Sequence, residues 1–242
     1  SRMKAKLDAG RSLLYMTARY VDIYKALEDI ARDRKLTPEE RKEMKQYSRL
    51  ADAFTPLAKG MNSEYANQNA YDAISIHGGS GFIMEYKSQR LYRDARIFSI
   101  YEGTTQLQVV AAVRYITNGT YLGIIKEMLQ GEVADDLKPL QERVAKMADR
   151  YAEAVEKVKA SGNQAEHDFL ARRLYDMTAD IIMSLLILAD ATKAPELFAK
   201  SAQVYVRAAE EEVVGHAAYV MAFEADDLKN FAAEDCKAEE EA

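Results

Sequence analysis

The chain has 242 residues, of which 48% are hydrophobic and 30% are charged, with only 4 prolines and 11 glycines. This composition is typical of helix-rich proteins and predicts an all-α fold. A formal net charge of −6 without a basic cluster excludes a general affinity for nucleic acid, because phosphate binding requires concentrated positive charge. The longest apolar run, residues 181–188, is far shorter than the roughly 20 residues that cross a bilayer, so we expect no membrane span.

Cysteine and histidine usage indicates neither a disulfide nor a metal site. The single cysteine, Cys236, cannot form an internal disulfide, which suits a cytoplasmic protein. The amino terminus shows no secretory signal. The histidines His77, His167 and His216 lack the spacing of metal ligands. We expect His77 to bond locally, His167 to be exposed, and His216 to be a hydrogen-bonded histidine of a helical bundle.

The first predicted helix runs from residue 1 to about residue 31. Large apolar residues recur in it at helical spacing and form a wide arc, made of Met3, Leu7, Leu14 and Val21 with Leu13, Tyr20, Tyr24 and Leu27 beside them. Charged residues fall outside that arc, namely Lys4, Arg11, Asp22 and Asp29. We therefore expect this helix to pack against more than one neighbour and to show a narrower polar strip to water.

A second helix is predicted to begin at Pro38. Thr37 can cap its first turn, and Glu40 can reach back to the Thr37 amide. Pro56 lacks an amide donor and disfavours helical backbone at the preceding residue, so we expect a kink or short break there. The helical pattern then continues until Gly78 ends it.

Beyond this point we expect two shorter helices, over residues 85–94 and 104–117. Three long helical patterns follow, over residues 137–160, 166–191 and 195–231. Because the composition changes after Gly119, we place a domain boundary near residue 120, between a bundle of residues 1–120 and a helical extension of residues 121–233. The acidic end, residues 234–242, holds little to bury and is expected to be disordered.

Four motifs lie close together between residues 76 and 106. They are Ile76-His77-Gly78-Gly79-Ser80-Gly81-Phe82, Glu85-Tyr86, Tyr92-Arg93-Asp94-Ala95-Arg96-Ile97 and Ile100-Tyr101-Glu102-Gly103-Thr104-Thr105-Gln106. In order and spacing they resemble the signature of the acyl-CoA dehydrogenase family, and weaker helical similarity covers roughly the first 120 residues. The resemblance implies the carboxy-terminal helical bundle of such an enzyme, followed by the additional long helices of its larger members.

The resemblance also implies a flavin-dependent dehydrogenation in which Glu102 is the catalytic base. Removing an α-proton from an acyl thioester requires a base beside the α-carbon and stabilisation of charge on the thioester oxygen. Glu102 would take the α-proton while a hydride leaves the β-carbon for FAD, which yields a trans-2-enoyl-CoA. The Glu102 N–H would bind the thioester oxygen, Gly103 would permit close approach, and Tyr101 would line the acyl pocket. Burial against flavin and substrate would raise the pKa of Glu102.

Other readings of these residues stay open. By position alone, Glu102 could be a carboxylate at the start of a helix. In family members, the positions matched here by Gly78, Gly79, Thr104 and Gln106 contact the adenosine and diphosphate of FAD, often the FAD of a neighbouring subunit. The same residue types would also be expected at these positions simply because helices end or are capped there. Ser75 stands where many members have a glutamine, so that contact is not assigned. An ion-pair network, rather than a phosphate clamp, is expected from Arg93, Asp94 and Arg96.

Family members also carry an amino-terminal helical domain and a β-domain that hold the flavin ring, and no match to these is found here. We therefore expect the chain to be part of a longer enzyme and to be inactive alone. The resemblance implies an acyl-CoA substrate, an electron-transfer flavoprotein as partner, and a homo-oligomer. Two alternatives remain, a relative of the acyl-CoA oxidase type that uses oxygen, and a non-catalytic helical assembly module.

Overall fold

The computed structural model describes residues 1–231, and every regular element in that range is helical, which confirms the all-α prediction. The α-helices are α1 (Arg2–Asp33), α2 (Pro38–His77), α3 (Gly79–Phe82), α4 (Lys87–Arg96), α5 (Thr105–Thr117), α6 (Thr120–Leu129), α7 (Lys138–Ser161), α8 (Gln164–Lys193) and α9 (Pro195–Ala222). Short 3₁₀ helices are η1 (Ile97–Ser99), η2 (Asp135–Leu137) and η3 (Ala225–Phe231). None of these helices is both long and apolar enough to cross a membrane. Cys236 and the predicted disorder of residues 234–242 lie outside the described residues.

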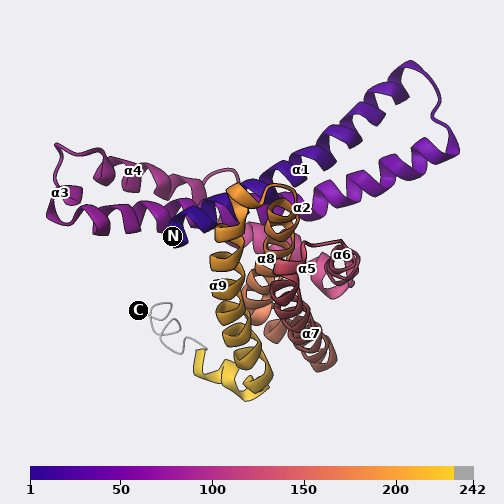
Figure 1. Cartoon of the computed structure of the whole chain (residues 1–242). Helices are drawn as coiled ribbons and strands as arrows, with labels where there is room; N and C mark the ends of the chain where they lie inside the picture. The colour runs from indigo at the N-terminus through magenta and orange to yellow at the C-terminus, as the bar shows by residue number, and fades with distance from the viewer. Residues whose placement is uncertain (232–242) are drawn as a thin grey trace, which may run out of the picture.

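Helices α1 and α2 form a long antiparallel pair that projects from the molecule as a hairpin arm, and the far end of α2 forms a second arm with α3 and α4 (Figure 1). Helix α2 begins where predicted, because Thr37 Oγ1 accepts a hydrogen bond from the Glu40 amide at 3.2 Å. The Glu40 carboxylate accepts one from the Thr37 amide at 2.8 Å, which completes the capping box. Gly78, at φ +60°, ends the helix as predicted.

Helix α2 continues through Pro56 without interruption, so the expected short break near Thr55 is wrong, and the kink expected as the alternative stays a prediction. Proline removes one backbone hydrogen bond, but two buried tyrosines bind carbonyls of the same turns. Tyr121 OH donates to the Ala53 carbonyl at 2.5 Å, and Tyr175 OH donates to the Pro56 carbonyl at 2.8 Å. Packing against α6 and α8 therefore holds the helix together where its local sequence disfavours it.

Helix α1 packs against more than one neighbour, as expected, namely α2, α8 and α9, but its buried face differs from the predicted apolar arc. Leu7 and Leu14 are each 50% exposed. The buried residues are mostly small or polar, namely Ala5, Asp8, Ala9, Gly10, Ser12, Leu13, Thr17 and Leu27. They allow close approach: a Cβ at Gly10 would lie 2.2 Å from the side chain of Asn62 on α2. Hydrophobic periodicity gives most weight to large side chains, so it misplaces a helix face that is buried through close contact.

Helix α8 occupies the centre of the second half of the chain. Every residue from 177 to 188 is buried, which includes the apolar run noted in the sequence. Helices α7 and α9 pack along α8, and α1 packs across both α8 and α9 (Figure 1). The apolar faces of α8 and α9 are therefore covered by helices of the first half of the chain. One continuous hydrophobic core contains residues from both sides of residue 120. The division of the chain into two domains at that residue stays a prediction.

Helix α6 was not predicted, because Asn118 and Gly119 form a strong helix stop. Gly119 adopts φ +78° and reverses the chain at once. The Asn118 side chain accepts a hydrogen bond from the Thr120 amide at 3.0 Å and so begins the next helix. Tyr121 and Ile125 then anchor α6 in the core, where both are fully buried.

Replacing Gly60 by alanine is expected to destabilise the protein by about 1–3 kcal/mol, the usual cost of overpacking a core. A Cβ at Gly60 would lie 2.1 Å from the hydroxyl oxygen of Tyr175 and 3.1 Å from its Cζ. Tyr175 is fully buried and bound to the Pro56 carbonyl, so it has no free space to enter. Urea denaturation of Gly60→Ala measures this loss.

In a Tyr175→Phe background the same substitution should cost clearly less, because the nearest clashing atom is absent. An alanine variant as stable as the wild type would contradict the packing described here, since the helix propensity of alanine offsets only about 1 kcal/mol.

Candidate functional site

The candidate site is the loop between α4 and α5, which carries Tyr101, Glu102 and Gly103. Among the described residues, Glu102 is the one non-glycine residue with a positive φ, at +51°, and Gly103 follows at +89°. Left-handed backbone at a residue with a side chain costs roughly 1–2 kcal/mol and persists only where surrounding contacts impose it. Contacts from outside the loop must therefore hold it.

Lys59, on α2, makes these contacts. Its ammonium donates to the Phe98 carbonyl at 2.9 Å and to the Gly103 carbonyl at 2.5 Å. The two carbonyls lie on either side of Glu102 in the sequence, so one side chain closes the loop around it. Gln108 adds a donor, from its Nε2 to the Gly103 carbonyl at 3.3 Å. Hydrogen bonds from a charged donor are about twice as strong as neutral ones.

The ion-pair network expected from Arg93, Asp94 and Arg96 is not formed. Asp94 pairs instead with Arg90 at 3.9 Å, and both side chains are more than 60% exposed, so the pair contributes little. Arg96 donates to the Ser99 hydroxyl. Adjacent residues of a helix point in different directions, whereas residues four apart share a face, which explains the change of partner.

The sequence does contain a signal for Lys59, although motif reading misses it. Lys59 is the only charged residue between Phe54 and Ser63. Its neighbours Leu57 and Ala58 are buried. A single charge in a core-facing helical segment needs a polar partner, and that partner is the backbone of the Glu102 loop.

Glu102 stands at the edge of a groove of about 500 Å³ between α1, α2 and the loop. The lining is mostly apolar and includes Leu14, Ala58 and Phe98. Tyr101 also lines the groove and is 46% exposed. The groove therefore presents a mostly apolar lining together with the carboxylate of Glu102. The resemblance implies that Glu102 is buried against flavin and substrate. In this chain alone its side chain is exposed.

The residues expected to contact FAD fall into two separate groups. Thr104 caps α5 by accepting a hydrogen bond from the Leu107 amide at 3.3 Å, and Gln106 is exposed beside it. Thr105 Oγ1 donates to Glu64 on α2 at 2.6 Å. Gly78 lies fourteen helical residues beyond Glu64, or about 21 Å along α2. One chain therefore does not bring the two groups together.

The segment around Gly78 is held by local contacts. His77 Nδ1 lies 2.7 Å from the Ala73 carbonyl, so the expected local role of this histidine is confirmed. Ser75 Oγ donates within its own helix, to the Tyr71 carbonyl at 3.4 Å. A Cβ at Gly81 would lie 2.6 Å from the Ile74 carbonyl oxygen, so glycine is required there by packing.

The other histidines lie far from this loop in the sequence. His216 is half-buried and contacts Arg173 at 3.3 Å, which confirms it as a bonded bundle histidine. His167 is partly buried rather than exposed, because Glu166 before it and Leu170 one turn later both face the core. No group of three or more histidine, cysteine or acidic residues in the described part of the chain is arranged to hold a metal ion.

Two family models match consecutive parts of the chain. Residues 1–116 match the model described as the acyl-CoA dehydrogenase C-terminal domain, and residues 117–228 match the model described as acyl-CoA dehydrogenase C terminal. Together they reach from α1 into η3.

Relatives of known name agree with these models. The 3-methylmercaptopropionyl-CoA dehydrogenase of Ruegeria pomeroyi is 38% identical over 107 residues, which are 44% of this chain and 16% of that protein. The caffeyl-CoA reductase-Etf complex subunit CarC of Acetobacterium woodii is 54% identical over 52 residues, 22% of this chain and 14% of the relative. The matched segments thus span about one-sixth of these proteins.

Among solved structures, an acyl-CoA dehydrogenase complexed with FAD from Bacillus anthracis superposes on the chain with a TM-score of 0.63. The match covers 94% of this chain and 42% of that one at 24% identity, and it shows that the fold is shared. The helical fold, the motifs around Glu102 and the two family models lead to one conclusion. The chain belongs to the acyl-CoA dehydrogenase family, of which it forms the carboxy-terminal helical part.

Proposed function

We propose that this chain is part of an FAD-dependent acyl-CoA dehydrogenase and that Glu102 is its α-proton base. The observation that carries the proposal is the backbone of Glu102, held in the left-handed region at the rim of an apolar groove. Strained backbone of this kind concentrates at active sites, where it directs a functional group. A carboxylate at the mouth of a groove that suits an acyl chain is well placed to take a proton from the α-carbon.

The amide of Glu102 supports a second role for the same residue. Within residues 1–231 its N–H donates to no protein acceptor. An unpaired N–H next to the carboxylate is available to the thioester oxygen and would stabilise the negative charge that develops as the α-proton leaves.

Two observations support contact with FAD. Gly79 lies outside the left-handed region and has no atom within 4 Å of a built Cβ, so nothing in the described chain requires glycine there. Such a glycine leaves room for a group that approaches from outside. Thr104 and Gln106 are exposed next to the Glu102 loop. When bound, FAD would accept the hydride that leaves the β-carbon.

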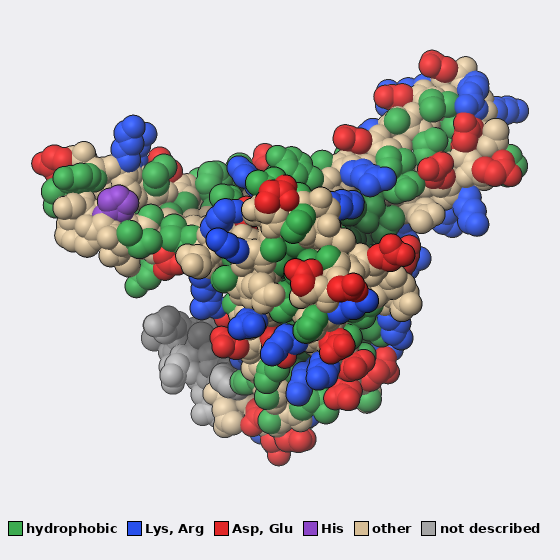
Figure 2. Space-filling view, viewed as in Figure 1, with side chains coloured by type: hydrophobic (Ala, Val, Ile, Leu, Met, Phe, Trp, Pro, Cys, Tyr) green, Lys and Arg blue, Asp and Glu red, His purple; other side chains and the backbone are tan. Residues whose placement is uncertain are grey.

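The acyl-CoA substrate, the electron acceptor and the assembly are proposals about the longer protein. The CarC relative is named as a subunit of an Etf complex, which favours an electron-transfer flavoprotein over oxygen as acceptor. Large apolar side chains are exposed around α3, most of all Met84 at 87% and Phe82 at 78%, and hydrophobic atoms are prominent on this arm in Figure 2. Exposed apolar patches favour a protein interface, which supports a homo-oligomer.

An anaerobic titration of the full-length protein with an acyl-CoA, followed by flavin absorbance, tests the role of Glu102. The wild type should bleach, and Glu102→Gln with flavin still bound should bleach at least about 100-fold more slowly, because the amide cannot take the proton. Glu85→Gln, at an exposed carboxylate of the preceding loop, should behave as the wild type. Equal bleaching in Glu102→Gln would remove the assignment, and a full-length protein without flavin would favour the non-catalytic module.

Replacing Lys59 by methionine should loosen the loop while the helices persist. Two charged hydrogen bonds are lost, so amide hydrogen exchange over residues 98–104 should accelerate at least about tenfold. Lys45→Met, at an exposed lysine of the same helix, is the control and should leave the loop unchanged. Unaltered exchange in Lys59→Met, measured by mass spectrometry on the 242-residue chain, would show that other contacts impose the Glu102 backbone.

A further inference from the structure

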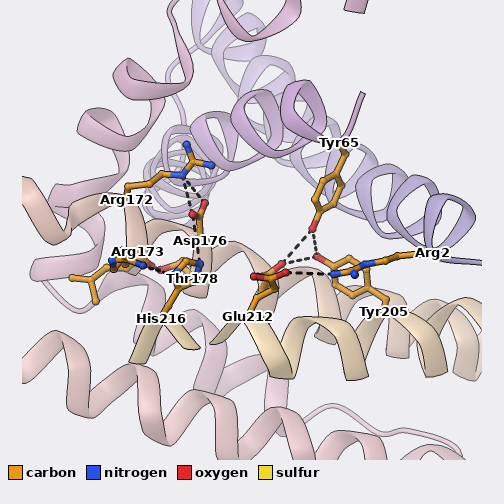
Figure 3. A network of polar contacts seen from close by, with 11 residues as sticks. Arg2, Tyr65, Arg172, Arg173, Asp176, Thr178, Tyr205, Glu212 and His216 are labelled. Carbon is orange, nitrogen blue, oxygen red and sulfur yellow. Dashed lines mark hydrogen bonds and ion pairs between the residues drawn. The ribbon is translucent and has the colours of Figure 1, made fainter. Parts of the chain in front are cut away.

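A second, smaller cavity lies between α1, α2, α8 and α9 and shares no lining residue with the Glu102 groove. Its volume is about 140 Å³. A cavity of this size accommodates a molecule of about six non-hydrogen atoms. Figure 3 shows the hydroxyls of Tyr65 and Tyr205 pointing toward each other, with Arg2 directed at Glu212 beside them.

Asp180, on α8, faces this cavity as a buried carboxylate without a cationic partner. It is 6% exposed. Its Oδ1 accepts hydrogen bonds from Tyr205 OH at 3.0 Å and Tyr65 OH at 3.3 Å. Within the described residues, its Oδ2 accepts no hydrogen bond, and no salt bridge reaches either oxygen. Buried carboxylates are ordinarily paired, so this one points to a partner from outside the chain.

The arginines that line the cavity are already engaged. Arg172 donates from Nε to both oxygens of Asp176 at 2.9 Å. Arg2 pairs with Glu212 at 3.4 Å at the edge of the cavity. Neither guanidinium is therefore available to neutralise Asp180.

The remaining basic groups do not neutralise Asp180 either. Lys6 donates to Gln68, and its ammonium lies 5.2 Å from the centre of the Tyr65 ring. Burial lowers the pKa of His216, which favours the neutral form of that ring.

Of the four carboxylates in the lining, Asp176 and Glu212 pair with arginines, and within the described residues neither Glu64 nor Asp180 is reached by a salt bridge. Glu64 is only partly buried and accepts a hydrogen bond from Thr105, so Asp180 is the buried carboxylate that lacks a cation.

We propose that this cavity binds a small primary ammonium ion, with its nitrogen at Asp180 and its alkyl part against Ala5, Met61 and Ala209. Asp180 Oδ2 and the two tyrosine hydroxyls offer acceptors to the three N–H donors of an ammonium group. The ligand would join four helices that come from both halves of the chain.

Ionisation of Asp180 determines how binding depends on pH. Burial and the nearby charge of Asp176 raise the pKa of Asp180 to about 7. The other groups that face Asp180 are Tyr65 from α2, Tyr205 and Glu212 from α9, and Lys6 from α1. An alkylammonium ion stays protonated below about pH 10. Affinity should therefore rise about tenfold between pH 6 and pH 8 as Asp180 becomes charged.

Isothermal titration of the 242-residue chain with n-butylammonium chloride at pH 8 tests the proposal. Saturable binding is expected at one site, whereas 1-butanol and butyrate, of similar size but without the positive charge, should not bind. Asp180→Asn should weaken binding at least about tenfold and remove its pH dependence. Asp168→Asn, an exposed aspartate of the same helix, should bind as the wild type.

A second variant separates loss of the charge from loss of the fold. Ala208→Leu fills the cavity from α9 and leaves Asp180 in place, so it should abolish binding while urea denaturation remains cooperative. Absence of saturable n-butylammonium binding to the wild type, equal binding by Asp180→Asn or Ala208→Leu, or equal binding of 1-butanol would each overturn the proposal.

Discussion

The middle of α2, from Pro56 to Gly60, is the segment on which the rest of the structure depends, because it contacts both the buried helix α8 and the Glu102 loop. On one side, Tyr175 of the buried helix α8 donates to the Pro56 carbonyl and occupies space that only glycine at position 60 leaves free. On the other side, Lys59 binds the two carbonyls that enclose Glu102. The position of the core and the position of the candidate base are therefore set by adjacent residues.

Through this arrangement, helices of the second half of the chain support the candidate site. Helix α8 is buried along its centre and packs against α5, the helix that follows the Glu102 loop. Helix α5 is in turn held to α2 by the hydrogen bond between Thr105 and Glu64. The loop thus lies between α2 and α5, which both pack against α8. Its strained backbone is therefore supported by contacts between residues far apart in the sequence.

Features that depend on neighbours within one turn could be predicted from the sequence. The Thr37 cap, the helix start at Pro38 and the stop at Gly78 are of this kind. Two of the errors concern features decided by tertiary contacts. Helix α2 passes through Pro56, and buried tyrosines from α6 and α8 bind the carbonyls of Ala53 and Pro56 in the same turns. Helix α1 buries small residues because close approach, rather than side-chain size, selects its inner face.

In the candidate site, too, local features could be predicted and distant contacts could not. Motif spacing is sufficient to select Glu102 and Gly103. The partners of Lys59 could not be predicted, because they lie 39 and 44 residues away and are brought to it only by folding. Asp180 is an equivalent case, since the Tyr65 hydroxyl that it binds is 115 residues distant.

Exchange of the α-proton of an acyl-CoA in D₂O tests the central claim most directly, because removal of that proton is the step assigned to Glu102. The full-length protein would be incubated with a 3-thia-acyl-CoA, which has no β-hydrogen to lose as hydride, and deuterium at the α-carbon would be read by mass spectrometry. Our account predicts rapid exchange by the wild type and a rate at least about 100-fold lower for Glu102→Gln with flavin bound. Equal exchange by the two proteins would contradict it and assign the base to another residue.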